Sequence, residues 1–166
     1  RAAHSACHPR TEREYPAAVS STETAPLPLI DNRYRVTRVL GEGGMGIVYE
    51  AQHVGTKRPF AVKLIHASIA RRGQAMERFL REGEAAGTIR SPHVVDVNDV
   101  GIDRATGSAF MAMELLSGDE LGKLIEERGR LSPQLALRIV AQALEGLPAA
   151  HRAGVVHRDI KPSNLW

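Results

Sequence analysis

A dense glycine cluster, Gly41, Gly43, Gly44 and Gly46, stands between two runs of strand-like sequence. Residues 34–40 partly alternate between apolar and polar types before it, and an apolar run resumes directly after it. Alternation with a period of two is typical of a strand, and glycines allow the chain to turn sharply. The sequence therefore predicts two strands joined by a glycine-rich turn, whose bare backbone can offer N–H donors to an anionic group.

The glycine string alone is compatible with several kinds of site. A dinucleotide-binding fold needs a helix directly after the string and an acidic residue about 20 positions further on. Here a strand is expected to follow, and the region beyond contains Lys63. A Walker A loop is excluded because Ile47 and Val48 follow Gly46 where Lys and Ser/Thr are required. A glycine-rich hairpin that binds no ligand stays open as an interpretation.

Lys63 lies among apolar neighbours in a strand predicted over residues 59–65. An unpaired ammonium group in such surroundings is costly, so the lysine needs an anionic partner unless an edge strand lets it reach water. Glu82 and Glu84 are the candidate partners on a helix predicted over residues 74–89. Both fall on the flanks of its apolar stripe, and periodicity does not choose between them.

The order of the other predicted elements separates a sheet from helices. Two more strands are expected at residues 94–102 and 109–116. A helix is expected to begin at the N-cap Ser132 and to end at Gly154, and Pro148 inside it should kink it or remove one backbone hydrogen bond. Its apolar run consists of Leu135, Ile139, Ala143 and Leu147, and we expect three of these, Leu135, Ile139 and Leu147, to form an exposed patch in this chain.

This order indicates an α+β chain with a small antiparallel-sheet lobe that contains one helix, followed by a helical lobe. Residues 1–30 contain prolines but no glycine, and they are predicted to be a disordered leader or linker. We place the small lobe at residues 31–116 and the start of the large lobe at residues 117–166.

The segment from Val155 to Asn164 carries the most specific chemical pattern. Asp159, Lys161 and Asn164 place a base, a cation and a metal-ligating amide within six residues, on what Pro162 makes a loop. Such a loop suits the transfer of a phosphoryl group. An ordinary polar turn is the alternative, and it is disfavoured because the glycine turn and Lys63 precede the loop in the same chain.

With these three motifs in this order, residues 31–166 closely resemble the bacterial eukaryotic-like (Hanks-type) serine/threonine protein kinases. The resemblance implies a protein-kinase-like fold, cut after the catalytic loop. It also implies that Lys63 contacts the α- and β-phosphates of ATP and pairs with Glu82, which the frame Arg78-Phe79-Leu80-Arg81-Glu82 selects. The other nucleotide-binding residues that it implies are Leu40, Gly41, Glu42, Gly43, Gly44, Met45, Gly46, Val48, Ala61, Met113 as gatekeeper, Glu114, Leu116 and Glu120.

In the catalytic loop the resemblance implies that Asp159 is the base that orients the substrate hydroxyl and that Lys161 steadies the γ-phosphate. Asn164 would hold Mg²⁺, and the ring of His157 would brace the loop. Lysine two positions after the aspartate is the serine/threonine pattern. The Asp-Phe-Gly motif, the activation segment and the rest of the helical lobe would lie beyond Trp166, so we expect the chain alone to be inactive.

We therefore expect a kinase that uses ATP and Mg²⁺ on proteins with serine or threonine and that self-associates for autophosphorylation. A pseudokinase or nucleotide-binding signalling module is the alternative, and a dinucleotide-dependent oxidoreductase is a weaker one. The net charge of +3 comes from scattered residues, so no nucleic-acid partner is expected. With no apolar run long enough for a membrane helix, we expect a cytoplasmic chain, with anchoring of the parent protein by a later segment left open.

Overall fold

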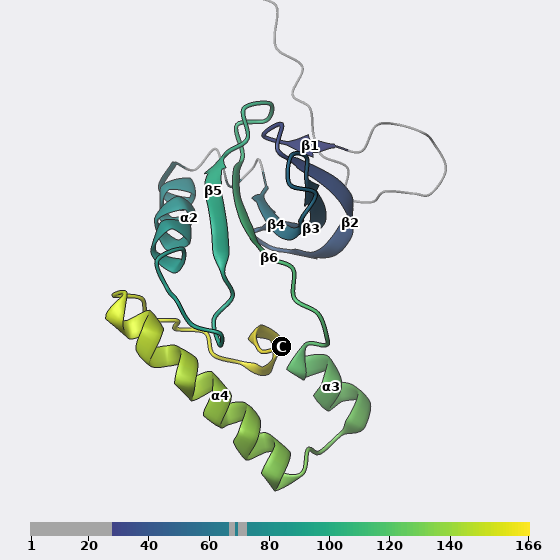
Figure 1. Ribbon diagram of the computed structural model, residues 1–166, viewed down its shortest axis with the longest axis vertical. Coiled ribbons are helices and arrows are strands. Elements are labelled where there is room, and N and C mark those ends of the chain that lie inside the picture. Colours follow the sequence, from purple (N-terminus) through teal and green to yellow (C-terminus); the bar gives the residue numbers. More distant parts are fainter. Residues whose placement is uncertain (1–27, 67–68, 70–72) are drawn as a thin grey trace, which may run out of the picture.

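The computed structural model describes residues 28–66, 69 and 73–166, and Figure 1 shows a sheet with one helix beside it and the other helices below it. The expected leader therefore lies almost wholly outside the described residues. The elements follow one another as β1 (Leu29–Ile30), β2 (Tyr34–Gly43), β3 (Gly46–His53), β4 (Pro59–Ile65), α2 (Gly73–Ala86), β5 (Val97–Ile102), β6 (Ala109–Glu114), α3 (Leu121–Arg128), α4 (Pro133–Arg152) and the short 3₁₀ helix η1 (Pro162–Asn164).

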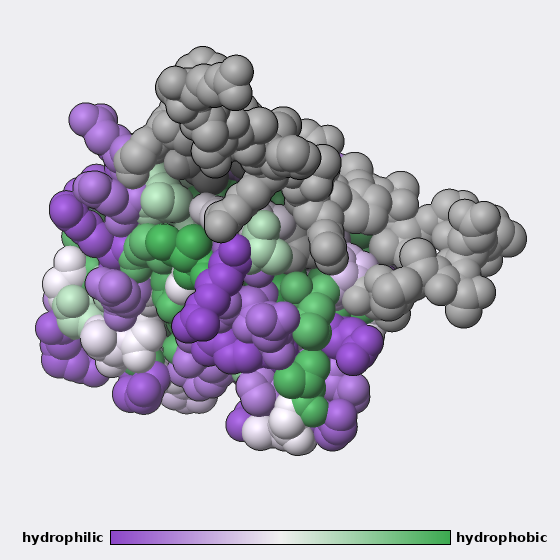
Figure 2. All heavy atoms as spheres, turned by 90° about the horizontal axis from the view of Figure 1, so that it is seen from above, coloured by the Kyte–Doolittle hydropathy of each residue, from purple (hydrophilic) through white to green (hydrophobic). Residues whose placement is uncertain are grey.

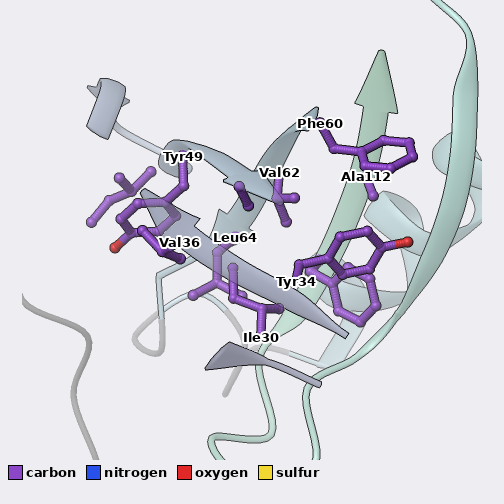
Figure 3. Packing of buried hydrophobic residues seen from close by; sticks show 11 residues of the cluster. Ile30, Tyr34, Val36, Tyr49, Phe60, Val62, Leu64 and Ala112 are labelled. Carbon is purple, nitrogen blue, oxygen red and sulfur yellow. The ribbon is translucent and has the colours of Figure 1, made fainter. Parts of the chain in front are cut away.

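The strands form one antiparallel sheet in the order β1-β2-β3-β4-β6-β5. Alternation places every second side chain on the same face, and one face carries the main hydrophobic core. Figure 3 shows this core, in which Tyr34 meets Phe60 at a ring-centroid distance of 5.6 Å, edge to face. Its buried members are Ile30, Tyr34, Val36, Ile47, Tyr49, Ala51, Phe60, Val62, Leu64, Phe110 and Ala112.

Helix α2 packs against the sheet through a second, smaller core. Phe79 of the helix is buried with Ile65 and Ala109 from the ends of β4 and β6. Gly83 faces the strands so closely that a Cβ atom there would lie 2.7 Å from Val100 Cγ2 and 2.8 Å from Met111 Cε. The approach of α2 to β5 and β6 therefore depends on the absence of a side chain at position 83.

A network of charged side chains fastens the start of β2 to β5. Arg33 lies 2.6 Å from an Asp99 carboxylate oxygen and 2.7 Å from an Asp31 carboxylate oxygen. The Tyr34 hydroxyl donates to Asp99 at 2.7 Å, and burial together with this bond raises the pKa of Tyr34 well above its usual range. Asp103 is fully buried and accepts the backbone N–H of Asp31 at 2.8 Å.

Helix α4 begins as expected: the Ser132 hydroxyl accepts the Leu135 N–H at 3.3 Å, and Pro133 is the first helical residue. It continues through Pro148 to Arg152, so the proline does not end it. Near its C-terminal end the helix docks on the segment after α2, where Ala149 and Ala150 pack on Ile89. Glu145 and the ring of His93 in that segment lie 2.9 Å apart.

The exposed side of α4 differs from the expected one. Leu137, Val140 and Leu144 are the exposed large residues, with 71%, 52% and 57% of their surface accessible. The run expected to be exposed, Leu135, Ile139 and Leu147, is half-buried instead. The helix is apolar on more than one face, so the position of the run in the sequence did not reveal which face is covered.

The α+β class and the sheet-then-helix order are confirmed, while several boundaries differ. Helix α2 ends at Ala86 rather than residue 89, because the Thr88 side chain and the Gly87 and Ile89 N–H groups close the turn. Strand β5 begins at Val97, since the Asp96 backbone N–H is taken by the Glu114 side chain. Strand β1 lies inside the expected leader, and neither β1 nor α3 was individually predicted.

Hydrophilic and hydrophobic residues are mixed over the described part of the face that Figure 2 shows. Within the residues that the structure describes, no helix has the length and apolar character needed to cross a membrane.

Candidate functional site

The face of the sheet opposite the main core brings together four of the predicted nucleotide-binding residues. The strand registers pair Val48 with Lys63 and Lys63 with Met111, and in the next row they pair Ala61 with Met113. Directly paired residues, and residues two apart on one strand, point to the same face. Val48, Ala61, Lys63 and Met113 therefore share a face of the sheet, which carries three apolar side chains and one ammonium group.

The glycine-rich segment forms the tight turn between β2 and β3, as expected. The ladder ends at the pair Gly43 and Gly46, which leaves Gly44 and Met45 as the turn. A Cβ atom at position 46 would collide with the Leu64 carbonyl oxygen, so the sheet itself requires this glycine. At Gly41, Gly43 and Gly44 an added Cβ would meet nothing within 4 Å. Their small size is therefore not explained by packing within the described chain.

Sequence reasoning missed His66, the residue directly after β4. Its Nε2 lies 3.1 Å from the Gly43 carbonyl oxygen, and its backbone N–H donates to the Met45 carbonyl at 3.2 Å. The Glu42 carboxylate is 3.9 Å from the same ring nitrogen. The register of β3 against β4 would have revealed this contact, but a single sequence does not fix that register.

The expected ion pair between Lys63 and Glu82 is not formed in the structure. Among the described residues, no carboxylate of α2 lies within 4.0 Å of the Lys63 ammonium. Glu82 is exposed on the helix, whereas Gly83 next to it faces the sheet. The residue that α2 turns toward the strands is thus Gly83 and not its neighbour Glu82, the predicted partner. Glu84 is exposed as well.

The segment after β6 leaves the sheet at Glu114. The Glu114 N–H donates to the Asp96 carbonyl at 3.0 Å, so this N–H is not available to an adenine ring. Leu116 lies beyond the strand, and within the described residues its backbone groups make no hydrogen bond to another backbone group. Glu120, the weaker candidate for the ribose, is the N-cap of α3, and its side chain makes no capping bond.

The loop before η1 and η1 itself bring together Asp159 and Lys161, predicted to be catalytic, and Asn164, predicted to be a metal ligand. Lys161 Nζ lies 2.9 Å from Asp159 Oδ2, and Asn164 Nδ2 donates to the same oxygen at 3.2 Å. Both contacts lower the pKa of the Asp159 carboxyl, that of Lys161 more strongly. Asp159 Oδ1 accepts no side-chain hydrogen bond within the described residues. One carboxylate oxygen is therefore occupied and the other is open.

Two further bonds fix the shape of this loop. The Asp159 N–H donates to His157 Nδ1 at 3.3 Å, which confirms that the histidine ring braces the loop. Arg158 between them adopts a φ of 62°, a left-handed conformation that a non-glycine residue rarely takes. The turn before Asp159 is thus held in an unusual backbone shape by its neighbours.

The amide of Asn164 is oriented for a cation. Its Nδ2 donates both to the Asp159 carbonyl, at 2.8 Å, and to the Asp159 carboxylate, so the amide oxygen Oδ1 points away from these partners. An amide oxygen is a suitable ligand for Mg²⁺, which takes few protein ligands. The residues present thus fit part of a magnesium site. In the described ranges no cluster of three or more His, Cys, Asp or Glu residues could hold a metal by itself.

In Figure 1 the loop and η1, beside the C-terminal label, lie between the lower end of the sheet and helices α3 and α4. The Leu121 N–H at the start of α3 donates to the Leu165 carbonyl at 2.8 Å, which ties the chain after the loop to that helix. The fold thus places the loop on the side of the sheet where β6 runs into α3.

Comparisons with known proteins give consistent matches. The model of the family described as the protein kinase domain matches residues 34–166. The chain is 44% identical over 147 residues to the probable serine/threonine-protein kinase pknA2 of Bifidobacterium longum, a match that covers 87% of this chain and 19% of that protein. It is 41% identical over 132 residues to the serine/threonine-protein kinase PknH of Mycobacterium bovis, covering 80% and 22%.

Among solved structures, the chain resembles the crystal structure of the Mycobacterium tuberculosis PknI kinase domain with a TM-score of 0.73 and 31% identity. This match covers 86% of this chain and 58% of that one. Of the two curated relatives, pknA2 and PknH, the chain spans about a fifth of the length.

Proposed function

Because this chain belongs to the protein kinase family, as the N-terminal part of a bacterial Hanks-type kinase domain, we propose that the protein transfers the γ-phosphate of ATP to serine and threonine hydroxyls of proteins. The observation that carries this proposal is the arrangement around Asp159. Its Oδ2 is occupied by Lys161 and Asn164, and its Oδ1 is open toward a hydroxyl group. A carboxylate held in this way has a fixed orientation and stays ionised.

The nucleotide is proposed to lie against the face that carries Lys63. Val48, Ala61 and Met113 supply apolar contacts to the base, and the Glu114 carbonyl and Leu116 backbone supply its hydrogen bonds. The glycine-rich hairpin from Leu40 to Val48 covers the phosphates, and its open surroundings at Gly41, Gly43 and Gly44 leave room for them. Glu120 is proposed to reach the ribose.

In the transfer step, the substrate hydroxyl donates its hydrogen bond to Asp159 Oδ1. The hydroxyl oxygen attacks the γ-phosphorus, the bond from phosphorus to the ADP oxygen breaks, and the proton passes to Asp159. Lys161 stays beside Asp159 and shares its charge with the γ-phosphate, and Asn164 Oδ1 is the ligand that this chain would offer to Mg²⁺. When bound, the metal would neutralise negative charge on the phosphates.

A nucleotide-binding signalling module without catalysis is the second candidate. The absence of a Lys63–Glu82 ion pair from the described residues favours it, because kinase activity needs that pair in place. In an active kinase, α2 would have to turn so that Glu82 replaces Gly83 at the sheet. The same protein can adopt both arrangements if the turn is part of its regulation.

The test is a transfer assay on the full-length protein that carries this sequence. Radiolabelled γ-phosphate, Mg²⁺ and a generic basic protein substrate are supplied, and labelled serine or threonine is measured beside binding of a fluorescent ATP analogue. We expect transfer by the wild type and none by Lys63→Met, with autophosphorylation between copies as part of the signal. Binding without transfer would favour the second candidate, and the absence of both would refute a nucleotide site.

A further inference from the structure

We propose that His66 is a positioning residue, one that holds the tip of the glycine-rich hairpin against the end of β4 and so sets its height above Lys63. This inference rests on the nucleotide site proposed above. It adds to that site a residue outside the glycine motif and outside the lysine strand.

His66 reaches both sides of the turn. The ring contacts the Gly43 carbonyl, before the turn residues Gly44 and Met45, at 3.1 Å. The backbone N–H of His66 reaches the Met45 carbonyl, the last one of the turn, at 3.2 Å. One residue thus bridges the two arms of the hairpin at the point where the strand ladder between them ends.

Within the described residues, few other contacts hold the hairpin tip. Gly41, Gly43 and Gly44 are exposed, and an added Cβ at any of them would meet nothing within 4 Å. Met45 is 51% exposed, so its side chain does not anchor the turn in the core either. Among the contacts of the described residues, the two bonds from His66 are those that join the tip to β4 beyond the ladder.

The chemistry of the ring nitrogen specifies what a substitute must provide. The two groups near Nε2 are the Gly43 carbonyl and the Glu42 carboxylate, and both are acceptors. Nε2 must therefore carry a hydrogen to bond either of them. A glutamine amide places an N–H donor at a similar reach, whereas leucine fills the volume and offers none.

The position of this contact links it to the phosphates. His66 is three residues after Lys63 on the same chain segment, so the ring spans from the lysine strand to the turn that would cover the phosphates. Loosening the turn should weaken the binding of ATP. It should not disturb Asp159, which lies in a separate loop. We therefore expect the Michaelis constant for ATP to rise about 3- to 10-fold, which corresponds to losing one ordinary hydrogen bond, with kcat at saturating ATP changed much less.

The experiment compares His66→Leu, His66→Gln and the wild type in the full-length protein. Gln52→Leu serves as a matched control, because it places a leucine at an exposed position at the far end of β3. Hydrogen exchange of the amides from Gly43 to Ile47 is measured without nucleotide, and the Michaelis constant for ATP and kcat are measured separately.

We expect faster exchange and a raised Michaelis constant in His66→Leu, with both values close to wild type in His66→Gln and in Gln52→Leu. Wild-type exchange and wild-type Michaelis constant in His66→Leu would overturn the proposal, as would a His66→Gln variant as impaired as His66→Leu. If His66→Leu does not fold, His66→Ala is judged by the same two measurements. If even the wild type binds no ATP, the proposed function fails, while the exchange data still decide whether His66 holds the turn.

Discussion

At the scale of single residues, Asp159 has two carboxylate oxygens with different surroundings, and its role can be tested apart from nucleotide binding. Asp159→Asn keeps the shape of the side chain but removes the base. We expect turnover to fall by about 10²–10⁴-fold, the usual contribution of a general base, while ATP affinity stays nearly unchanged. Turnover and binding of an ATP analogue are measured in parallel on the full-length protein. A large loss of affinity with normal turnover at saturation would assign Asp159 another role.

The protonation of Asp159 depends on its two neighbours. The Lys161 ammonium, followed by the Asn164 amide, lowers the pKa of the carboxyl, so the carboxylate stays ionised to a lower pH than an ordinary aspartate. Because the pKa is lowered in the folded state, the favourable contact is fully present above the unfolded-state pKa and is lost as the pH falls through the folded-state pKa.

Removing the Lys161 ammonium, the stronger of the two neighbours, should therefore raise the pKa of Asp159. We expect Lys161→Met to shift the Asp159 titration to higher pH, as followed by the carboxyl carbon resonance in NMR. Lys57→Met removes one positive charge at the exposed turn between β3 and β4, and it should leave the titration of Asp159 unchanged. An unchanged Asp159 titration in Lys161→Met would show that the ion pair is not maintained in solution.

At the scale of elements, the glycines of one hairpin serve different purposes. Gly46→Ala should destabilise the fold by about 1–3 kcal/mol, as overpacking does, because the added Cβ collides with the Leu64 carbonyl. Gly44→Ala meets no atom within 4 Å and should melt close to the wild type. Thermal unfolding of both variants is compared, together with ATP binding. Equal melting temperatures for the two would contradict the close approach of β3 to β4 at Gly46.

The sequence predicted the elements more reliably than their contacts. Alternation around the glycine cluster and the Ser132-Pro133 start of α4 are local signals, and both elements form where they were expected. The two-residue strand β1 carries no periodic pattern, and its existence depends on pairing with Arg35 and Tyr34. The position of Glu82 relative to Lys63 depends on the rotation of α2 on the sheet. That rotation follows from the close approach at Gly83, which no single-helix pattern reveals.

The candidate site likewise contains contacts that the sequence predicted and contacts that it did not. The Asp159, Lys161 and Asn164 contacts lie within six residues, so the spacing alone brought these groups into one loop. The shared face of Val48, Lys63 and Met113 needs the register of three strands, which the sequence alone does not fix. His66 was missed for the same reason. Their assignment to ATP stays a prediction that the variants above test.

At the scale of the whole molecule, α4 determines how the chain behaves by itself. Figure 1 shows this helix at the lower edge of the described part of the chain. Leu137, Val140 and Leu144 recur at helical spacing on its exposed side, and its other side packs on the segment after α2. A helix that is apolar on both sides is typical of a buried one. The chain covers 58% of the matched PknI chain, so we infer that further residues of the domain cover this face in a complete kinase.

Residues 1–166 expressed alone should therefore associate and should not catalyse transfer. The exposed leucines of α4 favour contacts between copies. Among the described residues of the segment 157–164, Asn164 Oδ1 is the ligand that we propose for Mg²⁺, and one such ligand would be too little to hold the ion. Sedimentation velocity and Mg²⁺-dependent transfer from ATP measure the two parts separately. The double variant Leu137→Glu and Leu144→Glu should shift the isolated chain toward monomer, whereas Leu165→Glu, outside α4, should not.

In the full-length protein the same double variant should lower the melting temperature, because there it would bury two charges. A monodisperse, active wild-type chain of 166 residues would contradict both expectations and would mean that its metal is held by residues other than those assigned here.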